Sequence, residues 1–313
     1  MTTLLLSHPA YLDHLTPPGH PERPDRLRAI NQVLAEERFK TLVRVEAPEG
    51  KLDTVMLCHS EHYVTELRHV APTRGMVYID GDTSMSPGTW EAVMRGVGGA
   101  VAASDAVMTG AHTNAFVAVR PPGHHAEKST PMGFCFFDNA AIAARYAQRK
   151  YGIARAAVVD FDVHHGNGTQ DIFWADRSVM YCSTHQMPLF PGTGAAGERG
   201  EHDTIVNAPL ASEDGSQQFR SAFENRILPH LKKFAPELII ISAGFDAHYR
   251  DPLASLNLRA DDFGWVTQKL MDVADSSAGG RIVSVLEGGY DLQGLTESVA
   301  AHVTALMGGS LKS

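Results

Sequence analysis

The chain has 313 residues, 43% of them hydrophobic and 20% charged, a composition typical of a globular protein rather than a disordered or fibrous one. Its formal net charge of −9 would repel a phosphate backbone, and no run of Lys and Arg forms a basic stripe. We therefore expect no direct nucleic-acid binding. No stretch approaches the ~20 apolar residues that span a membrane, so we expect no membrane contact either.

The start of the chain and its cysteines bear on the compartment. The first ten residues lack a basic segment, and their apolar stretch, Leu4 to Leu6, is too short for a signal peptide. Cys58, Cys135 and Cys182 are an odd number without C-x-x-C spacing, which favours neither a disulfide framework nor a thiolate zinc site. We expect a cytoplasmic protein.

Strand and helix patterns alternate along the chain. Short apolar runs rich in Val and Ile predict buried strands that start near residues 4, 115, 156, 179, 238 and 282. Amphipathic segments predict helices over 89–108, 138–150, 216–233, 260–275 and 293–307. This alternation predicts an α/β fold with a central, mainly parallel sheet flanked by helices. No repeat or linker interrupts it, so we expect residues 1–313 to form a single domain.

Two segments read as loops. Residues 71–88 and 184–215 both contain Gly and Pro and show no clear periodicity. Because long loops in compact domains are usually functional, we expect the second segment to be a functional loop.

Four of the predicted strands are each followed at once by a polar cluster. The clusters are RPPGHH at 120–125, DFDVHHGNG at 160–168, GFD at 244–246 and EGGY at 287–290. In open α/β sheets, ligands bind outside the carboxyl ends of the strands. We therefore expect the four clusters to converge on one site at that edge of the sheet.

A metal site is the first expectation for these clusters. Asp162 and His164 are two residues apart, so their side chains would point the same way if the strand stayed extended through them. With Asp246 they make three N/O ligands and leave a position for water, the pattern of catalytic zinc, although Fe(II) or Co(II) would also suit it. The alternative is that Asp162 caps the next helix and Asp246 is a lone carboxylate after a strand.

A pair of histidines is the second feature of the clusters. His124 and His125 follow a stiff Pro-Pro-Gly corner, and tandem imidazoles are suited to binding and deprotonating a metal-held water. Asp160 is placed to accept an N–H from one of them and so determine its tautomer, or else it only accepts backbone amides.

Tyr290 is the third feature. Gly288 and Gly289 permit close backbone approach and positive φ, which would turn Tyr290 toward the mouth of the sheet. There its phenol would donate a hydrogen bond to a developing oxyanion. The alternative is a packed tyrosine with its hydroxyl in water.

With these residues assembled, the sequence resembles the histone deacetylase superfamily, and more closely its class II and bacterial histone deacetylase-like amidohydrolase branch, relatives of the acetylpolyamine amidohydrolases. The matching segments are GHPERPDRL at 19–27, RPPGHHA at 120–126, GFCFFDNAAIA at 133–143, DFDVHHGNGTQ at 160–170, FPGTG at 190–194, SAGFDAHYRDPL at 242–253 and LEGGYDL at 286–292. The likeness spans nearly the whole chain, and it implies the arginase-deacetylase α/β fold.

The resemblance also implies roles for single residues. It implies one Zn²⁺ per chain, held by Asp162, His164 and Asp246. His125 would act as general base and then general acid, while His124, held by Asp160, would contribute electrostatically. Tyr290 would polarise the acyl carbonyl.

Two positions place the chain within that superfamily. Class I members carry an aspartate where this chain has Asn167, which cannot stabilise an imidazolium by charge, so His125 should be less basic here than in class I. Tyr290 keeps the residue that weakly active class IIa members replace with histidine. We therefore predict true deacetylase activity.

Substrate and potassium sites are implied in the same way. The resemblance implies an acyl-lysine channel walled by Phe134 and Phe190, although the two rings would also suit an ordinary core. The remaining substrate-binding residues would be Gly133, Leu253 and Gly288. Structural K⁺ would use Asp160, Asp162, His164 and Ser183 at one site, and Phe173, Asp176 and Val179 at a second.

Leu253 bears on the substrate. Polyamine-selective relatives with a eukaryotic-type pocket carry a glutamate at this position, seven residues after the third metal ligand, and a leucine offers no charge to a cation. We therefore favour acyl-lysine in peptides or proteins over acetylpolyamines. An acidic residue before Trp90, such as Asp80 or Asp82, would still be able to recruit a polyamine.

Two other functions stay open. A two-metal ureohydrolase of the arginase type shares the fold but would need an aspartate at Gly166, so its absence argues for one metal. A non-catalytic acyl-lysine binder would predict damage to the metal or proton residues, and none is damaged. The oligomeric state is also open, including a homo-oligomer.

Overall fold

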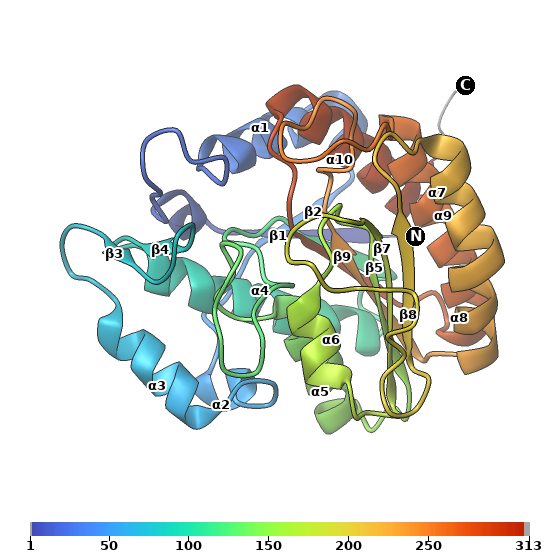
Figure 1. Ribbon diagram of the computed structural model, residues 1–313, viewed down its shortest axis with the longest axis horizontal. Helices are drawn as coiled ribbons and strands as arrows, with labels where there is room; N and C mark the ends of the chain where they lie inside the picture. The colour runs from blue at the N-terminus through green and yellow to red at the C-terminus, as the bar shows by residue number, and fades with distance from the viewer. Residues whose placement is uncertain (1, 310–313) are drawn as a thin grey trace.

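The fold is built on one eight-stranded sheet in which every neighbouring pair of strands is parallel (Figure 1). The computed structural model describes residues 2–309. The strand order is β2-β1-β5-β10-β9-β6-β7-β8. The strands are β1 Thr3–Ser7, β2 Val43–Glu46, β5 Asn114–Val117, β6 Ala156–Asp160, β7 Val179–Gln186, β8 Ile205–Leu210, β9 Leu238–Ala243 and β10 Ile282–Leu286.

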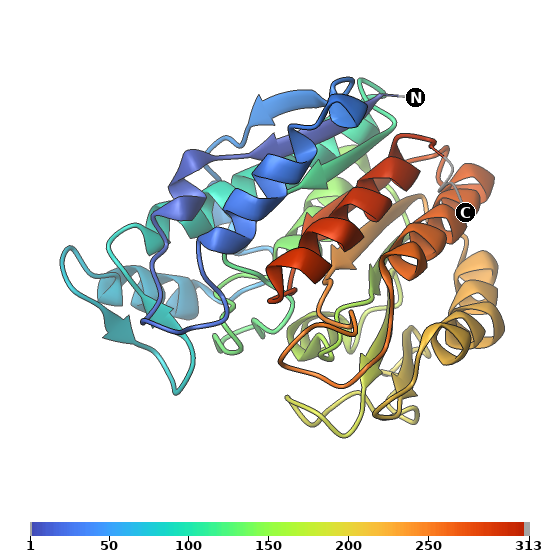
Figure 2. The ribbon, with the colours of Figure 1, turned by 90° about the horizontal axis from the view of Figure 1, so that it is seen from above.

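Helices cover both faces of this sheet (Figure 2). The helices are α1 Asp25–Leu34, α2 Leu52–Val55, α3 Glu61–Val70, α4 Thr89–Met108, α5 Asn139–Tyr151, α6 Asn167–Phe173, α7 Ser216–Ala222, α8 Leu228–Phe234, α9 Ala260–Ser277 and α10 Leu292–Leu306. On one face α10 packs between α1 and α9, and α8 packs on α9; on the other, α5 packs between α4 and α6. The sheet is thereby enclosed, which confirms the predicted α/β architecture.

Enclosure by helices explains the sequence of the central strands. A strand covered on both faces has no solvated side, so it reads as a continuous apolar run and not as an alternating one. All residues of β9 and β10 are buried, and in register Val283 lies between Ala115 on β5 and Ile240 on β9. Of the described helices, none is long and apolar enough to cross a membrane.

The predicted strands and helices are present, and three segments differ from the expectation. The segment 184–215 is not one functional loop, since β7 continues to Gln186 and β8 occupies Ile205–Leu210. The segment 71–88 contains a short antiparallel hairpin, β3 Val77–Tyr78 with β4 Ser84–Met85. The predicted helix 216–233 is divided by a π turn, Phe223–Ile227, just before Pro229, which has no N–H for a helical hydrogen bond.

Two glycines let α4 approach its neighbours closely. A Cβ at Gly98 would overlap the carbonyl oxygen of Pro48, and one at Gly96 would lie 2.8 Å from Cγ2 of Val119. Val119 belongs to the segment that leads from β5 to the histidine pair. The close approach of α4 therefore supports one of the four polar clusters from behind.

We expect Gly98→Ala to lower the free energy of unfolding by about 1–3 kcal/mol, because the added methyl group has no room. This would occur although alanine favours a helix over glycine by about 1 kcal/mol. Urea denaturation measures the effect. Gly81→Ala is the control, since no atom of the described chain would lie within 4 Å of its Cβ, and a similar loss in both variants would contradict the argument.

Candidate active site

The four polar clusters come together because the four strands that precede them are neighbours. In the strand order, β5, β10, β9 and β6 are consecutive, and all four run in the same direction. Their carboxyl ends therefore lie at one edge of the sheet, where the clusters at 120–125, 160–168, 244–246 and 287–290 follow them. The expectation of a single site at that edge is met.

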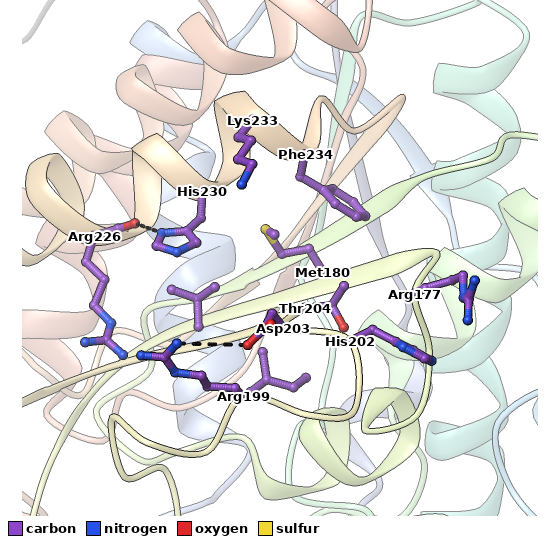
Figure 3. A pocket seen from close by; sticks show the side chains of 12 residues that line it. Arg177, Met180, Arg199, His202, Asp203, Thr204, Arg226, His230, Lys233 and Phe234 are labelled. Carbon is purple, nitrogen blue, oxygen red and sulfur yellow. Dashed lines mark hydrogen bonds and ion pairs between the residues drawn. The ribbon is translucent and has the colours of Figure 1, made fainter.

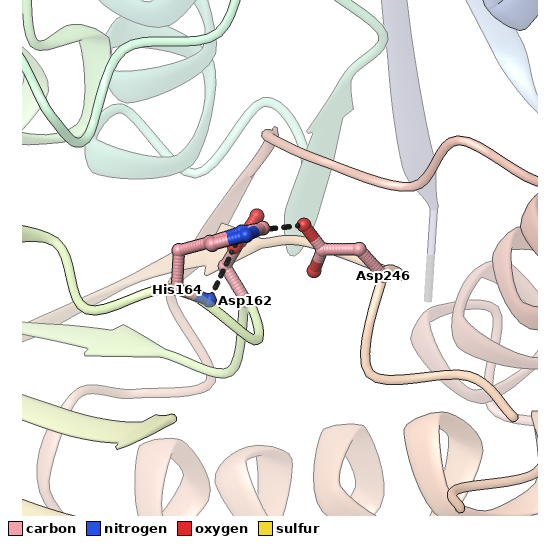
Figure 4. Close-up of side chains that lie close together, drawn as sticks. All are labelled: Asp162, His164 and Asp246. Carbon is pink, nitrogen blue, oxygen red and sulfur yellow. Dashed lines mark hydrogen bonds and ion pairs between the residues drawn. The ribbon is translucent and has the colours of Figure 1, made fainter. Parts of the chain in front are cut away.

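Asp162, His164 and Asp246 form a buried group whose ligand atoms all lie within 4.8 Å of one another (Figure 4). His164 Nδ1 lies 3.2 Å from Asp162 Oδ1 and 3.1 Å from Asp246 Oδ2. Backbone N–H groups hold both carboxylates: Gly288 donates to Asp162 at 2.8 Å and Val163 donates to Asp246 at 2.8 Å.

The two carboxylates of this group favour the binding of a cation. Burial and the charge of Asp162 raise the pKa of Asp246 to about 6, because two carboxylates that share a buried site repel each other. A divalent cation bound between them would remove that repulsion. One imidazole and two carboxylates suit Zn²⁺ and related N/O-preferring ions.

The metal residues converge through a turn and not through a strand. β6 ends at Asp160, so the extended geometry that we expected does not continue to His164. Asp160 Oδ1 accepts the N–H of Asp162 at 3.0 Å and holds the turn. The next helix, α6, begins at Asn167 with Gly166 as its N-cap, so Asp162 does not cap it.

The two histidines lie against each other with different partners. Their ring centroids are 4.0 Å apart, His124 Nδ1 lies 2.9 Å from Asp160 Oδ2, and His125 Nδ1 lies 2.8 Å from Asn167 Oδ1. The amide of Asn167 also donates from Nδ2 to Glu127 at 2.8 Å, which turns its oxygen toward His125. His125 therefore carries its proton on Nδ1, and its Nε2 is left as an acceptor.

The unequal partners give the histidines unequal basicity. Burial alone would lower the pKa of His124, but the carboxylates of Asp160 and Asp162 outweigh it and hold that pKa well above its ordinary range. Burial and the positive charges of His124 and His164 hold the pKa of His125 well below its ordinary range. The pKa values of the two imidazoles are thus shifted in opposite directions.

Gly166 is required by the packing around Asp160. A Cβ at this position would lie 2.5 Å from both Asp160 Oδ2 and Tyr181 Oη, and Tyr181 itself donates to Asp160 at 3.0 Å. An aspartate at residue 166, the extra ligand that a two-metal site would need, has no room here.

Tyr290 is buried close to the metal group, where the charges of Asp246 and Asp162 act on its phenol. Gly289 has φ of 120°, which supports the expectation that glycine turns the chain at this point. The Tyr290 ring packs edge-on to Phe134 with centroids 5.9 Å apart, and the guanidinium of Arg26 lies 4.9 Å over it. Burial holds the pKa of the phenol well above its ordinary value, so the hydroxyl stays protonated and available to donate.

The two expected channel aromatics lie on different neighbours, Phe190 against His125 and Phe134 against Tyr290. Phe190 is 42% exposed, and its ring lies 5.1 Å from that of His125. Phe134 adopts a left-handed φ of 71°, next to Gly133 at 57°. A Cβ at Gly133 would lie 2.5 Å from His125 Cδ2, so this turn brings the backbone against the imidazole. The rings therefore border the approach to the site instead of filling the core.

The remaining predicted residues lie further out. Leu253 is half-buried and donates its N–H to Asp251, and Asp251 also accepts the N–H of Tyr290 at 2.7 Å. Ser183 lies opposite Asp160 in the β6–β7 register. Asp176 forms an ion pair with Arg145, between Phe173 at the end of α6 and Val179 at the start of β7.

A buried ion cluster behind the site was not foreseen. Glu22 accepts from Arg120 at 2.7 Å and from Arg26 at 3.0 Å, and all three side chains are fully buried. Arg26 also donates to the backbone oxygens of Gly289 at 2.6 Å and Glu287 at 2.5 Å. The cluster therefore ties the GHPERPDRL segment to two of the polar clusters.

Glu287 is the second residue that was missed. Its side chain is fully buried, and Oε2 accepts the N–H groups of Gly123 at 2.7 Å and His124 at 3.2 Å. Burial raises the pKa of this carboxyl to about 8. The signal in the sequence was an acidic residue directly after the apolar run of β10.

Comparison with known proteins agrees with this geometry. Residues 20–306 match the family model of the histone deacetylase domain. The chain is 38% identical to a probable deacetylase of Archaeoglobus fulgidus, over 99% of this chain and 87% of that protein. It is 37% identical to a histone deacetylase-like amidohydrolase of Pseudomonas aeruginosa, over 87% and 73%. The solved structure of the HDA15 HD domain superposes with a TM-score of 0.92 at 34% identity, covering 99% and 89%.

We expect Gly288→Ala to weaken metal binding, because the added Cβ would overlap Asp246 Oδ2 and lie 2.6 Å from Asp162 Oδ2. The measurements are bound zinc per chain and the rise in Tm on adding Zn²⁺, both of which should fall. Gly197→Ala is the control, since its Cβ would meet no atom of the described chain within 4 Å. A folded Gly288→Ala protein that binds zinc as the unaltered chain does would contradict the assignment.

Proposed function

Because the chain belongs to the histone deacetylase family, we propose that it is a zinc-dependent amidohydrolase that removes acetyl or other acyl groups from the ε-amine of lysine in peptides or proteins. The observation that carries the proposal is the buried group of Asp162, His164 and Asp246 facing two histidines of opposite basicity. An amide hydrolase needs both a strong electrophile and a residue that accepts and returns a proton.

The side chains divide the chemistry between them. Zn²⁺, when bound, supplies Lewis acidity to the acyl carbonyl and to water. His125 accepts the water proton at Nε2, since its Nδ1–H is held by Asn167, and then returns that proton to the departing lysine amine. His124, kept cationic by Asp160, contributes positive charge where negative charge develops.

Tyr290 completes the stabilisation of that negative charge. Its protonated phenol lies beside Phe134 and donates to the acyl oxygen. Phe134 and Phe190 hold the aliphatic part of the lysine side chain between their rings, because two aromatic faces bury methylene groups well. Structural K⁺ at the two sets of residues named above belongs to the same proposal.

An acetylpolyamine is the second candidate substrate, and one contact supports it. Phe134 donates its N–H to Thr83 Oγ1 at 3.1 Å, which brings the loop of Asp80 and Asp82 to the channel. A carboxylate in that loop would attract a distal ammonium group. Against this, the position that carries a glutamate in polyamine-selective relatives is Leu253, and acyl-lysine remains the first choice.

The site fits the remaining alternatives less well. A two-metal ureohydrolase lacks room for its extra ligand at Gly166, and a non-catalytic binder would not need the paired histidines. We place the protein in the cytoplasm, since its three cysteines are free and buried, as suits a reducing compartment. A homo-oligomer remains compatible with this proposal.

We expect Tyr290→Phe to lower kcat by about 10²–10³-fold, since one oxyanion donor is lost. His125→Ala should lower it by about 10²–10⁴-fold, since the proton acceptor is lost. The assay is hydrolysis of a fluorogenic acetyl-lysine peptide by the zinc-loaded protein. Tyr146→Phe, on the remote helix α5, is the control and should keep full activity. Intact activity in either site variant would refute the role given to that residue.

A substrate comparison separates the two candidates. We expect kcat/KM for the acetyl-lysine peptide to exceed that for acetylputrescine and acetylspermidine, because Leu253 gives the distal ammonium no counter-charge. If a polyamine were the better substrate, and Asp80→Asn or Asp82→Asn abolished that preference, the polyamine alternative would replace the lysine proposal.

A further inference from the structure

A pocket lies at the end of the sheet opposite to the metal group. It has a volume of about 720 Å³ and is bordered by the starts of β7 and β8, by the segment before β8 and by the helical segment that ends in α8 (Figure 3). Because all strands of the eight-stranded sheet are parallel and the polar clusters follow their carboxyl ends, this pocket at the amino ends of β7 and β8 is separate from the candidate active site.

Cationic side chains approach this pocket from two directions. Arg226, His230 and Lys233 are spaced four and three residues apart, so they share one face of the helical segment. From the other side of the pocket, the segments around β7 and β8 contribute the basic residues Arg177, Arg199 and His202. Figure 3 shows these side chains around a common space.

Little negative charge offsets these groups. Among the lining residues Asp203 is the only carboxylate, 4.0 Å from Arg199, which leaves a net positive charge of three with both histidines neutral. Among the ion pairs of residues 2–309 with N···O distances up to 4.0 Å, none involves Arg177, Arg226 or Lys233. Arg226 is held in place by its hydrogen bond to the carbonyl of Ala196 at 2.6 Å. This concentration occurs in a chain whose net charge is −9.

The rest of the lining is apolar apart from Thr204. Met180, Ile205, Val206 and Phe234 contribute to the pocket between the basic groups. A ligand that suits this mixed lining carries several negative charges together with an apolar group. A volume near 720 Å³ lies within the range of small-molecule and cofactor sites.

We propose that this pocket binds an organic polyphosphate of the nucleoside di- or triphosphate class. Guanidinium groups bind phosphate oxygens in pairs of parallel hydrogen bonds, and Lys233 adds a compact charge. The base would pack on Phe234 and Met180. A small anion needs only the local positive field, whereas an extended nucleic acid would also meet the negative charge of the remaining surface.

Titration calorimetry with the zinc-loaded chain at 0.15 M salt tests the proposal, with ATP, pyrophosphate and adenosine as probes. We expect ATP to bind most tightly, pyrophosphate more weakly and adenosine least. The double variant Arg177→Gln/Lys233→Gln should weaken ATP binding by about tenfold or more, since charged hydrogen bonds to phosphate are lost. Neither side chain makes a hydrogen bond within the described chain, so folding should be unaffected.

Lys232→Gln is the matched control, because Lys232 neighbours Lys233 on α8 but lines a different surface hollow. It should bind ATP as the unaltered chain does. ATP could also remove zinc from the active site, but it would do so equally in the unaltered chain, the double variant and Lys232→Gln. Zinc removal would therefore not produce a difference in ATP binding between these proteins. The proposal is overturned if ATP does not bind, if adenosine binds as well as ATP, if the control is weakened equally, or if duplex DNA binds as tightly.

Discussion

The site depends on one electrostatic constraint: adjacent parallel strands end at the same edge and bring buried carboxylates together. Asp160, Asp162, Asp246 and Glu287 all follow or end such strands, and each is almost fully buried. Buried like charges are costly unless hydrogen bonds or opposite charges offset them. The chain supplies backbone N–H groups, two imidazoles and a place for a cation, so the groups that we propose for catalysis also offset these buried charges.

A second ion cluster extends this compensation to the backbone. Glu22 is bound by Arg26 and Arg120, and Arg26 also reaches the carbonyl oxygens on both sides of Gly288. Removing one partner from a buried ion pair typically costs about 3–5 kcal/mol, because the other charge is left without compensation. The contacts of Arg26 hold the segment that carries Tyr290. The contacts of Arg120 hold the start of the Pro-Pro-Gly corner that leads to the two histidines. The geometry of the proton-transfer groups is thus maintained from behind by residues that touch no substrate.

The sequence alone predicted the central strands and most of the long helices, because β9 and β10 are continuous apolar runs and α4 has clear helical spacing. It did not predict β2, all of whose residues are exposed, or β8, whose strand lies inside a segment rich in Gly and Pro. The metal residues were identifiable from spacing after strands. The roles of Glu22 and Glu287 were not, since their partners are distant in sequence and only the fold brings them together. For Glu287 the sequence showed only an acidic residue directly after an apolar run.

Carboxylates gather in the candidate active site and cationic side chains gather in the pocket at the amino ends of β7 and β8, and the composition of the chain does not reveal this. A net charge of −9 and the lack of basic runs argue against polyanionic ligands, yet Arg177, Arg199 and Arg226 come from separate segments and line one pocket. The net charge of the whole chain does not reveal charged side chains that lie far apart in the sequence and are brought together by folding. Acidic residues gather where the strands end because a cation and imidazoles balance them there. At the amino ends of β7 and β8 no comparable number of carboxylates lines the pocket, and the positive field it presents is the kind that phosphate groups neutralise.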